Sequence, residues 1–289
     1  MSHFTDNSKG AILMMLAMAT FTLNDLCFKG LSGNVPLFEG LFIRGVMTTV
    51  MTLALAKYLG QLNFQMSKSD WIYTAWRAVA EIGSAYFYLT ALFHMPIGNI
   101  VAIMQALPLT ISLAGALFLR EPIGWHRIVA IIVGFLGVML IVRPGADGFN
   151  AYAIYGLGAV ACVTIRDLVT RKLSPEAPSM TLTVTASVSV MVFGLFGLPT
   201  ETWVMPSAMS WMLLFGAAIF IIGGYLFSIM VMRVGDIDFV APFRYTALIF
   251  ALVLGFVFYD EWPDFWTLVG SAIVVATGLY TLYREHHAR

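Results

Sequence analysis

The sequence predicts an all-α membrane protein with ten transmembrane helices, built as a five-plus-five inverted-topology repeat. Three observations support this fold class. Of the 289 residues, 60% are hydrophobic and only 11% are charged, whereas about a quarter of the residues of a soluble domain carry charge. Apolar runs about twenty residues long, enough for one helical crossing of a bilayer, follow one another with short connections. Finally, motifs of the first half return in the second half at a nearly constant spacing.

The apolar runs set the helix boundaries, because backbone groups in a bilayer core can be satisfied only within each helix. The first run lacks a small-residue cleavage site, so it is interpreted as a membrane span and not as a signal peptide. The ten predicted helices cover residues 10–31, 37–58, 70–94, 97–119, 125–143, 151–173, 179–199, 208–233, 237–259 and 264–283.

The internal repeat is clearest in residues 25–32, which return 142 positions later as residues 167–174 with the same Asp, Leu, cation, Leu and Ser. An odd number of helices in each copy forces the second copy to insert upside down, an arrangement that is common in transporters. We therefore predict one integral membrane domain in which residues 1–145 form the first repeat and residues 146–289 the second, with the seam at residues 144–150.

Cations in the short loops predict the orientation of the chain, because such residues favour the cytoplasmic side. With a cytoplasmic N-terminus, the outer connections hold little positive charge beyond Lys29 and Arg143. We therefore expect a multi-pass protein of the bacterial inner or plasma membrane with both termini in the cytoplasm. The cations on the predicted inner side are Lys9, Lys57, Lys68, Arg120, Arg127, Arg171, Lys172, Arg233, Arg284 and Arg289.

Charged residues inside the predicted spans are candidates for function, because each costs free energy unless it faces protein or water. Asp25 and Lys29, for example, are four residues apart and share one helical face. Snorkelling of the longer side chains toward the surface is the structural alternative. The residues assigned to gating or charge pairing are Asp25, Lys29, Glu39 and Arg44 toward the outer side, and Arg166 and Asp167 in the sixth helix.

Arg77 and Arg244 are the leading candidates for substrate binding. Each lies about seven residues from the inner end of its helix, so the two share a similar depth. Their repeat counterparts, 140 positions away, are Ala217 and Met104, so the symmetry of the scaffold does not require these charges. Arginine binds carboxylate or phosphate through its planar fork, which predicts an anionic or zwitterionic ligand.

Nearby acids leave a structural alternative open for both arginines. Glu81 lies four residues after Arg77 on the same face and would neutralise it, while Asp167 or Asp25 would neutralise Arg244. A buried carboxylate titrates nearer to neutral pH. Glu81 and Asp167 are therefore also candidates for carrying a coupling proton.

Polar and aromatic residues complete the candidate site. Pro108 and Pro242 lie inside helices and each removes a backbone hydrogen bond, so they are expected to kink the fourth and ninth helices. The uncharged candidates for binding are Asn24, Trp76, Tyr86, Tyr88, Gln105 and Tyr245. For Asn24 and Gln105, a helix–helix hydrogen bond is the structural alternative.

Motifs of enzyme and cofactor chemistry are absent from the sequence. It contains no P-loop, no G-x-S-x-G elbow and no H-E-x-x-H pair. Cys27 and Cys162 lie in apolar runs without ligand spacing, which indicates neither a disulfide nor a metal site. A net charge of zero gives no basic signal for nucleic acid. We expect no enzyme activity, no cofactor, no metal and no nucleic-acid partner.

A family resemblance appears around the fourth and fifth helices. Residues 91–108 read ALFHMPIGNIVAIMQALP, followed by ALFLREP at 116–122 and GFLGVMLIVRP at 134–144. This pattern resembles the drug/metabolite transporter superfamily, EamA type, whose repeats carry a proline in helix 4, a Glu-Pro turn and a Gly-x-x-Gly-Val helix. The second half departs from the pattern, with YDEWP at 259–263 in place of the usual Gly-Glu-x.

The resemblance spans nearly the whole chain and implies a carrier that works by alternating access around a cavity lined by helices such as 3, 4, 8 and 9. Residues 242–245, PFRY, resemble a subgroup that includes riboflavin-type and S-adenosylmethionine-type carriers. The expected function is secondary transport of a small organic metabolite, with an anionic or zwitterionic compound favoured: an amino acid, an organic acid, or a vitamin-like or nucleoside-like compound. Two alternatives remain: an exporter of bulky aromatic or cationic compounds, and a non-transporting membrane partner or intramembrane enzyme. Proton coupling and the choice between monomer and homodimer stay open.

Overall fold

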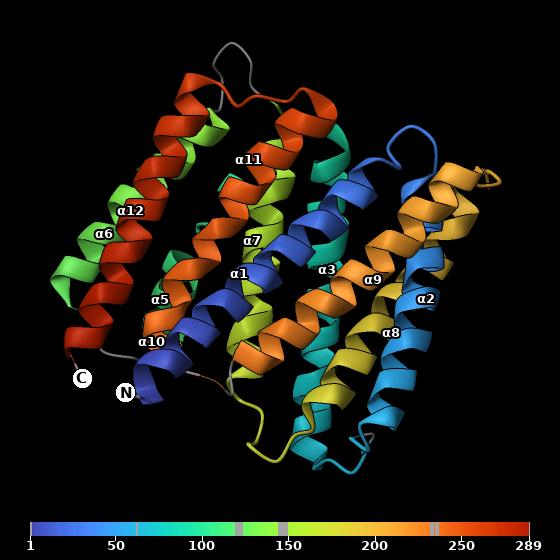
Figure 1. The fold of residues 1–289 in the computed structure, drawn as a ribbon, viewed down its shortest axis with the longest axis horizontal. Coiled ribbons are helices and arrows are strands. Elements are labelled where there is room, and N and C mark those ends of the chain that lie inside the picture. The colour runs from blue at the N-terminus through green and yellow to red at the C-terminus, as the bar shows by residue number, and fades with distance from the viewer. Residues whose placement is uncertain are drawn as a thin grey trace.

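The computed structural model describes residues 2–61, 63–118, 124–143, 150–231, 234 and 237–288. Within these ranges it is helical throughout and has no strand (Figure 1). The Glu-Pro turn at 121–122, residues 144–149 of the predicted seam, and Arg120, Arg233 and Arg289 lie outside the described residues. The elements are α1 (Ser2–Lys29), α2 (Leu37–Tyr58), α3 (Lys68–His94), α4 (Ile97–Met104), α5 (Leu107–Phe118), α6 (Trp125–Val142), α7 (Tyr152–Thr170), α8 (Ser179–Gly197), η1 (Leu198–Thr200), α9 (Ala208–Val231), α10 (Ile237–Val240), η2 (Ala241–Tyr245), α11 (Thr246–Tyr259) and α12 (Phe265–Ala288).

The prediction of an all-α membrane chain is confirmed. Among the described residues, eight helices are long and apolar enough to cross a membrane, and α6 adds a shorter apolar stretch, Ile128–Val142. The 27-residue helix α3 completes the set and carries Arg77 and Glu81 in its middle. Each of the ten predicted runs coincides with a helix or with an interrupted helix.

Two of the ten runs are interrupted near mid-length. In the first half, α4 ends at Met104, because Pro108 has no N–H to donate to the Met104 carbonyl. In the second half, α10 passes into the 3-10 helix η2, which contains Pro242, before α11 begins. The interruptions fall at Gln105 and Tyr245, which are 140 positions apart, so both halves break their helix at corresponding positions.

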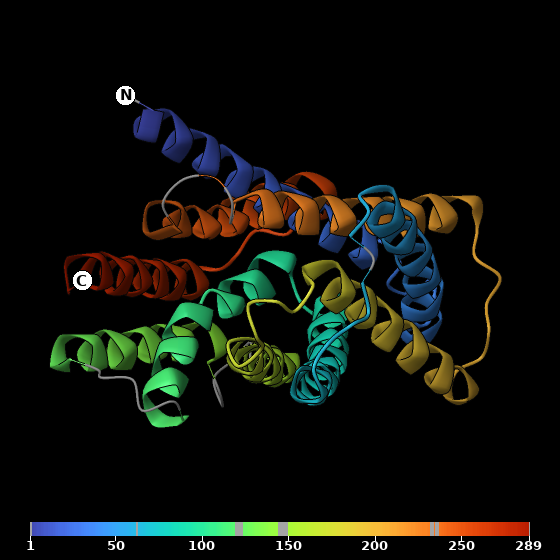
Figure 2. The ribbon, with the colours of Figure 1, turned by 90° about the horizontal axis from the view of Figure 1, so that it is seen from below.

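The helices of the two halves pack in matched pairs (Figures 1 and 2): α1 packs along α9 and α3 along α7, while α2 packs along α8 and α6 along α12. Lys29, at the end of α1, donates hydrogen bonds to carbonyls at the end of α3, so α1 and α3 run in the same direction. His94 at the end of α3 stacks on Tyr152 at the start of α7, with ring centroids 3.9 Å apart. Helix α7 therefore runs opposite to α1.

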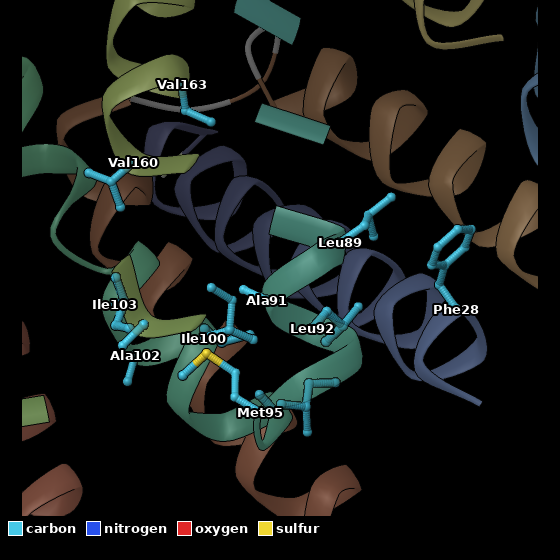
Figure 3. Close-up of a cluster of buried hydrophobic side chains, with 14 of the residues drawn as sticks. Phe28, Leu89, Ala91, Leu92, Met95, Ile100, Ala102, Ile103, Val160 and Val163 are labelled. Atoms are coloured by element: carbon cyan, nitrogen blue, oxygen red, sulfur yellow. The ribbon is translucent and has the colours of Figure 1, made fainter. Parts of the chain in front are cut away.

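A hydrophobic core closes the end of the bundle away from the termini. It lies where α1 and α3 end and α4 begins (Figure 3). Phe28, Leu92 and Ile100 are fully buried there. In a membrane such clusters stabilise the fold mainly by close packing, because lipid tails are as apolar as the side chains.

Small residues let α2 and α8 approach closely. A Cβ added at Gly194 would lie 2.6 Å from the backbone nitrogen of Phe42, and one at Gly45 would lie 2.7 Å from the Cα of Met191. Glycine at helix interfaces permits such backbone contact in membrane proteins. The two glycines therefore fix the spacing of one of the matched pairs.

Candidate functional site

A central cavity of about 1210 Å³ is lined by both halves of the chain. It exceeds the roughly 300–1,000 Å³ of typical ligand pockets. Five arginines and three acids contribute to its wall, so cations outnumber anions. These residues are Arg44, Arg77, Arg166, Arg171 and Arg244, with Asp25, Glu81 and Asp167.

The cavity reaches the end of the bundle that holds both termini. Its wall includes Arg171, directly after α7, and Leu282, near the end of α12. Figure 1 places both chain ends on this side. In the other direction the wall extends to Asp25 and Tyr88, beyond which lies the core around Phe28. We call the termini side the mouth and the opposite end the floor.

Polar contacts reinforce the closed end beyond the floor. Lys29 Nζ lies 3.0 Å from Glu261 Oε1 and donates to the carbonyls of Leu92 and Met95 at 3.2 and 2.7 Å. The second oxygen of Glu261 accepts a 2.9 Å hydrogen bond from the N–H of Ile97, which begins α4. One ion pair therefore ties together α1, α3, α4 and the segment before α12.

Two of the outer charges, Lys29 and Glu39, find their partners in distant elements and not in their own helices. Lys29 pairs with the second half, although Asp25 lies on its own helical face. Glu39 accepts a 2.9 Å hydrogen bond from the N–H of Val204, while Arg44 lines the cavity. Lys29 and Glu39 thus belong to the closed end, whereas Asp25 and Arg44 belong to the cavity.

A hydrogen-bonded network forms the floor. Arg44 Nη1 donates to Asn24 Oδ1 at 3.0 Å, and Asn24 Nδ2 donates to Asp25 Oδ1 at 2.9 Å. The Tyr88 hydroxyl donates to the other Asp25 oxygen at 2.6 Å. The Arg44 guanidinium also covers the ring of Phe28, 4.7 Å from its centroid. Asn24 therefore stands between the carboxylate and the guanidinium.

A second network lies at mid-depth between α3 and α7. Glu81 Oε2 lies 3.9 Å from Arg77 Nη2 and 3.5 Å from Arg166 Nη1. Arg166 also donates from Nε to Asp167 Oδ1 at 2.9 Å, and Arg77 donates to the carbonyl of Leu182 at 3.3 Å. The network thus contains two arginines and two acids, and Glu81 lies near both arginines.

Arg244 and Tyr245 lie in the interruption of the second half and line the cavity. Arg244 is exposed and forms no ion pair with another described residue. The buried Tyr245 hydroxyl has no hydrogen-bond partner among the described residues and abuts Gly278 of α12. Gln105, from the interruption of the first half, also lines the cavity. The two broken helices therefore bring to one space a polar amide and a cation that has no ion-pair partner among the described residues.

Not every sequence candidate reaches the cavity. Trp76 is 61% exposed and absent from the wall, and Tyr86 packs outside it against the rings of Phe38 and Phe193. Neither residue lines this cavity, because a single helix presents only one face to it. Pro108 lines the wall, whereas Pro242 does not.

Tyr225 lines the cavity but was not predicted from the sequence. Its ring meets that of Phe21 edge-on, with centroids 5.7 Å apart. The available signal was a lone phenol in the mostly apolar α9. Glu261 was also missed, although its acid stands in the segment where the second half departs from the family pattern.

Comparison with known proteins identifies the same kind of molecule. A model of the EamA-like transporter family matches the chain twice, over residues 8–143 and 150–283. The S-adenosylmethionine uptake transporter of Rickettsia conorii is 24% identical over 278 residues, covering 95% of this chain and 92% of that protein. The riboflavin transporter of Vibrio cholerae is 26% identical over 271 residues, covering 92% and 90%. The pseudopaline exporter CntI of Pseudomonas aeruginosa is 27% identical over 275 residues, covering 92% and 93%.

A solved crystal structure shares the fold, with a TM-score of 0.66 at 20% sequence identity, covering 98% of this chain and 99% of the other. The resemblance to the drug/metabolite transporters seen in the sequence is confirmed. The family match covers both halves, eight of the described helices are apolar enough to span a membrane, and a large cavity with charged residues in its wall lies between the halves. The chain is an integral membrane transporter of small metabolites and belongs to the EamA-like transporter family.

Proposed function

We propose that this transporter carries a metabolite with an anionic or zwitterionic group by alternating access. The observation that carries the proposal is the charge of the cavity wall: among the described residues, and without counting the exposed Arg171, four arginines face three acids. A guanidinium keeps its charge at any relevant pH, and taking it out of water costs free energy unless an anion accompanies it. A bound carboxylate or phosphate would supply that anion.

We further propose that the two halves are related as inverted repeats. The opposite directions of α1 and α7 support this relation, as do the matched helix pairs. Residues at the repeat spacing line the cavity together, among them Asp25 with Asp167 and Gln105 with Tyr245. Paired interruptions in corresponding helices mark the substrate site in many carriers of this kind.

The mouth of the cavity is proposed to face the cytoplasm of a bacterial cell. Lys57, at the end of α2, and Lys68, at the start of α3, are exposed on the mouth side, where cations of short loops favour the cytoplasm. Both termini share that side. The structure then corresponds to the inward-open state of an inner-membrane carrier.

The roles of the charged residues follow from their partners. Arg244, free of ion pairs with the described residues, and Arg77, whose contact with Glu81 is as long as 3.9 Å, are proposed to bind the anionic group. Glu81 pairs with Arg77 and Arg166, and Asp167 pairs with Arg166; these two acids are proposed to carry the proton if transport is proton-coupled. Lys29, bound at the closed end, is proposed to act in the outer gate.

An exporter of bulky aromatic or cationic compounds is the alternative. The aromatic side chains of Phe21, Tyr88 and Tyr225 in the cavity wall favour it. The relatives named for uptake, for riboflavin transport and for export show that both directions occur among similar proteins. Family membership speaks against an intramembrane enzyme.

A thermal-shift screen of the purified protein tests the proposal. Amino acids, organic acids, vitamins and nucleoside derivatives would be added to the wild type, to Arg244→Ala and to Lys57→Ala, a matched control that removes a cation outside the cavity. A ligand at a hundred times its dissociation constant stabilises by about 2.7 kcal/mol. We expect an anionic or zwitterionic compound to stabilise the wild type and the control but not Arg244→Ala. Equal stabilisation of all three proteins by cations or neutral aromatics would favour the exporter instead.

A further inference from the structure

We infer that the floor of the cavity is a subsite for an α-amino-acid head group, with the ligand carboxylate on Arg44 and the ligand ammonium on Asp25. The inference rests on the proposed function, because it names the substrate class of the same cavity. It uses residues other than Arg77 and Arg244, so the two ideas can fail separately.

The first support is that the two floor charges are kept apart. No Arg44 nitrogen lies within ion-pair distance of Asp25 among the described contacts, and Asn24 bonds to both side chains instead. Arg44 is only 7% exposed and Asn24 only 4% exposed. Burial normally drives opposite charges into direct contact, because each is costly when left alone in a low-dielectric site. A spacer between them maintains two separate charges.

The second support is the unused hydrogen-bonding capacity of both charges. Asp25 accepts one bond on each oxygen, from Asn24 and from Tyr88, whereas a carboxylate offers about four lone-pair sites. The described bonds of Arg44 include one donation, to Asn24, whereas a guanidinium has five N–H donors. Both residues line the cavity. A ligand at the floor can therefore place a cationic group on the Asp25 carboxylate and an anionic group on the Arg44 guanidinium.

The third support is the shape of the spacer. The Asn24 amide presents an oxygen to Arg44 and a nitrogen to Asp25, joined through a single carbon. An α-amino acid presents a carboxylate oxygen and an ammonium nitrogen on neighbouring carbons. Such a head group can span the same two charges beside Asn24, whereas a lone amine or a lone acid satisfies only one of them.

The rest of the cavity wall determines in which direction the ligand side chain extends. The core around Phe28 blocks the space behind the floor, so the ligand side chain must extend toward the mouth. Phe21 and Tyr225 line that path, and aromatic faces suit an apolar or aromatic group. The expected ligand is an amino acid with a long or aromatic side chain.

Binding to the purified full-length protein tests the inference, with two matched series of probes. The first contains L-tryptophan, tryptamine and indole-3-propionate. The second contains S-adenosyl-L-methionine, its decarboxylated form and its deaminated form, which keeps the carboxylate. Hydrogen bonds to charged groups contribute enough that loss of either end weakens binding about tenfold or more. In the wild type, the zwitterion of at least one series should bind at least tenfold more tightly than its partial analogues.

Variants of the floor residues test which residue binds the ammonium of the ligand and which binds its carboxylate. Asp25→Asn should remove the preference for the zwitterion over the acid, and Arg44→Gln should remove its preference over the amine. Asn24→Ala keeps both charges but lets them meet, so it should weaken zwitterion binding about tenfold. The matched controls are Asp6→Asn on α1 and Lys57→Gln on α2, which remove charges outside the cavity and should bind as the wild type does. Arg44→Lys retains the positive charge but not the planar fork, and it replaces Arg44→Gln in the test if that variant does not fold.

Two results would overturn the inference. One is that no zwitterion binds more tightly to the wild type than its amine or acid analogue. The other is that the preference survives in Asp25→Asn and Arg44→Gln. Proteoliposomes separate this outcome from failure of the proposed function: transport of riboflavin or of an acid without an ammonium group would leave the transporter intact and remove only the amino-acid subsite.

Discussion

Replacing Glu261 with alanine tests whether the ion pair beyond the floor holds the far side of the carrier closed. The substitution leaves Lys29 without its anion and removes the acceptor for the Ile97 N–H. Both groups lie where α1, α3 and α4 meet. If the contact exists only while this end is closed, its loss shifts the protein toward the state that opens there.

The magnitude follows from the geometry of the pair. At 3.0 Å the gross attraction is about 5.5 kcal/mol with an effective dielectric constant of about 20. The side chains of Lys29 and Glu261 are 10% and 22% exposed, so the pair is largely shielded from water. Removing one partner of a buried pair costs about 3–5 kcal/mol, and the partial exposure of Glu261 favours the lower value. A loss of about 3 kcal/mol corresponds to roughly a hundredfold shift in the equilibrium.

Labelling of a single cysteine measures the shift. Ser84 lies in the cavity wall, and Ser84→Cys would be introduced after Cys27 and Cys162 are changed to serine. A membrane-impermeant maleimide is then applied from the side of the membrane opposite the mouth. It should react with Cys at position 84 at least tenfold faster when Glu261→Ala is added to this single-cysteine protein than when it is not. Glu176→Ala, which removes an exposed acid, serves as control. Unchanged far-side labelling in a folded Glu261→Ala protein would show that the pair does not act as a gate.

Three further predictions concern packing and exposure. Gly194→Leu should lower the free energy of unfolding by about 1–3 kcal/mol, because a Cβ there meets the backbone of Phe42. Gly124→Ala should not, because beyond its chain neighbours no described atom lies within 4 Å of the added Cβ; equal thermal stability of the two variants would refute the close packing of α2 and α8. Tyr245→Phe should leave thermal stability unchanged or slightly higher, since the hydroxyl it removes is buried without a described partner; a clear loss would reveal a partner. Trp76→Leu should leave transport rates in proteoliposomes unchanged, because Trp76 is outside the cavity wall; a large loss would place the ring on the transport path.

The number and limits of the helices were predictable because apolar length alone decides a membrane crossing. The face that each helix presents was harder to predict, since these helices are apolar on nearly every side. Helix α3 nevertheless carried a signal that was not used: its cavity-lining polar residues follow spacings of four, three and four, which place them on one face. They are Arg77, Glu81, Ser84 and Tyr88. Trp76 and Tyr86 fall off this stripe, and neither lines the cavity.

Contacts between distant elements could not be predicted from spacing. Asp25 and Lys29 share a helical face, but Lys29 lies at the helix end, where a long side chain can reach the free carbonyls of α3 and Glu261 of the second half. The interruptions at Gln105 and Tyr245 were only partly predictable. Proline indicates a missing hydrogen bond, but whether a helix bends or breaks depends on the helices packed around it.

In the proposed inverted repeat, the residues that would recognise the substrate differ from those that the two halves share. Asp25 and Asp167 correspond across the repeat, so each half keeps an acid on the cavity wall. At the same spacing, Asn24 corresponds to Arg166 and Arg44 corresponds to Ala186. Exchange of the two halves would therefore bring Asp167 to a floor where an adjacent arginine already neutralises it and where Ala186 takes the place of Arg44.

An amino-acid head group would consequently meet a complete subsite in the state described here and an incomplete one in the opposite state. A ligand shifts an equilibrium only through its different affinity for two states. The zwitterion should therefore favour the state with an open mouth, and its release on the far side would be assisted by the pairing of Asp167 with Arg166. On this reasoning, the paired helices of the two halves allow the change between the two states. The residues that have no equivalent in the other half, above all Arg44 and Asn24, select the substrate.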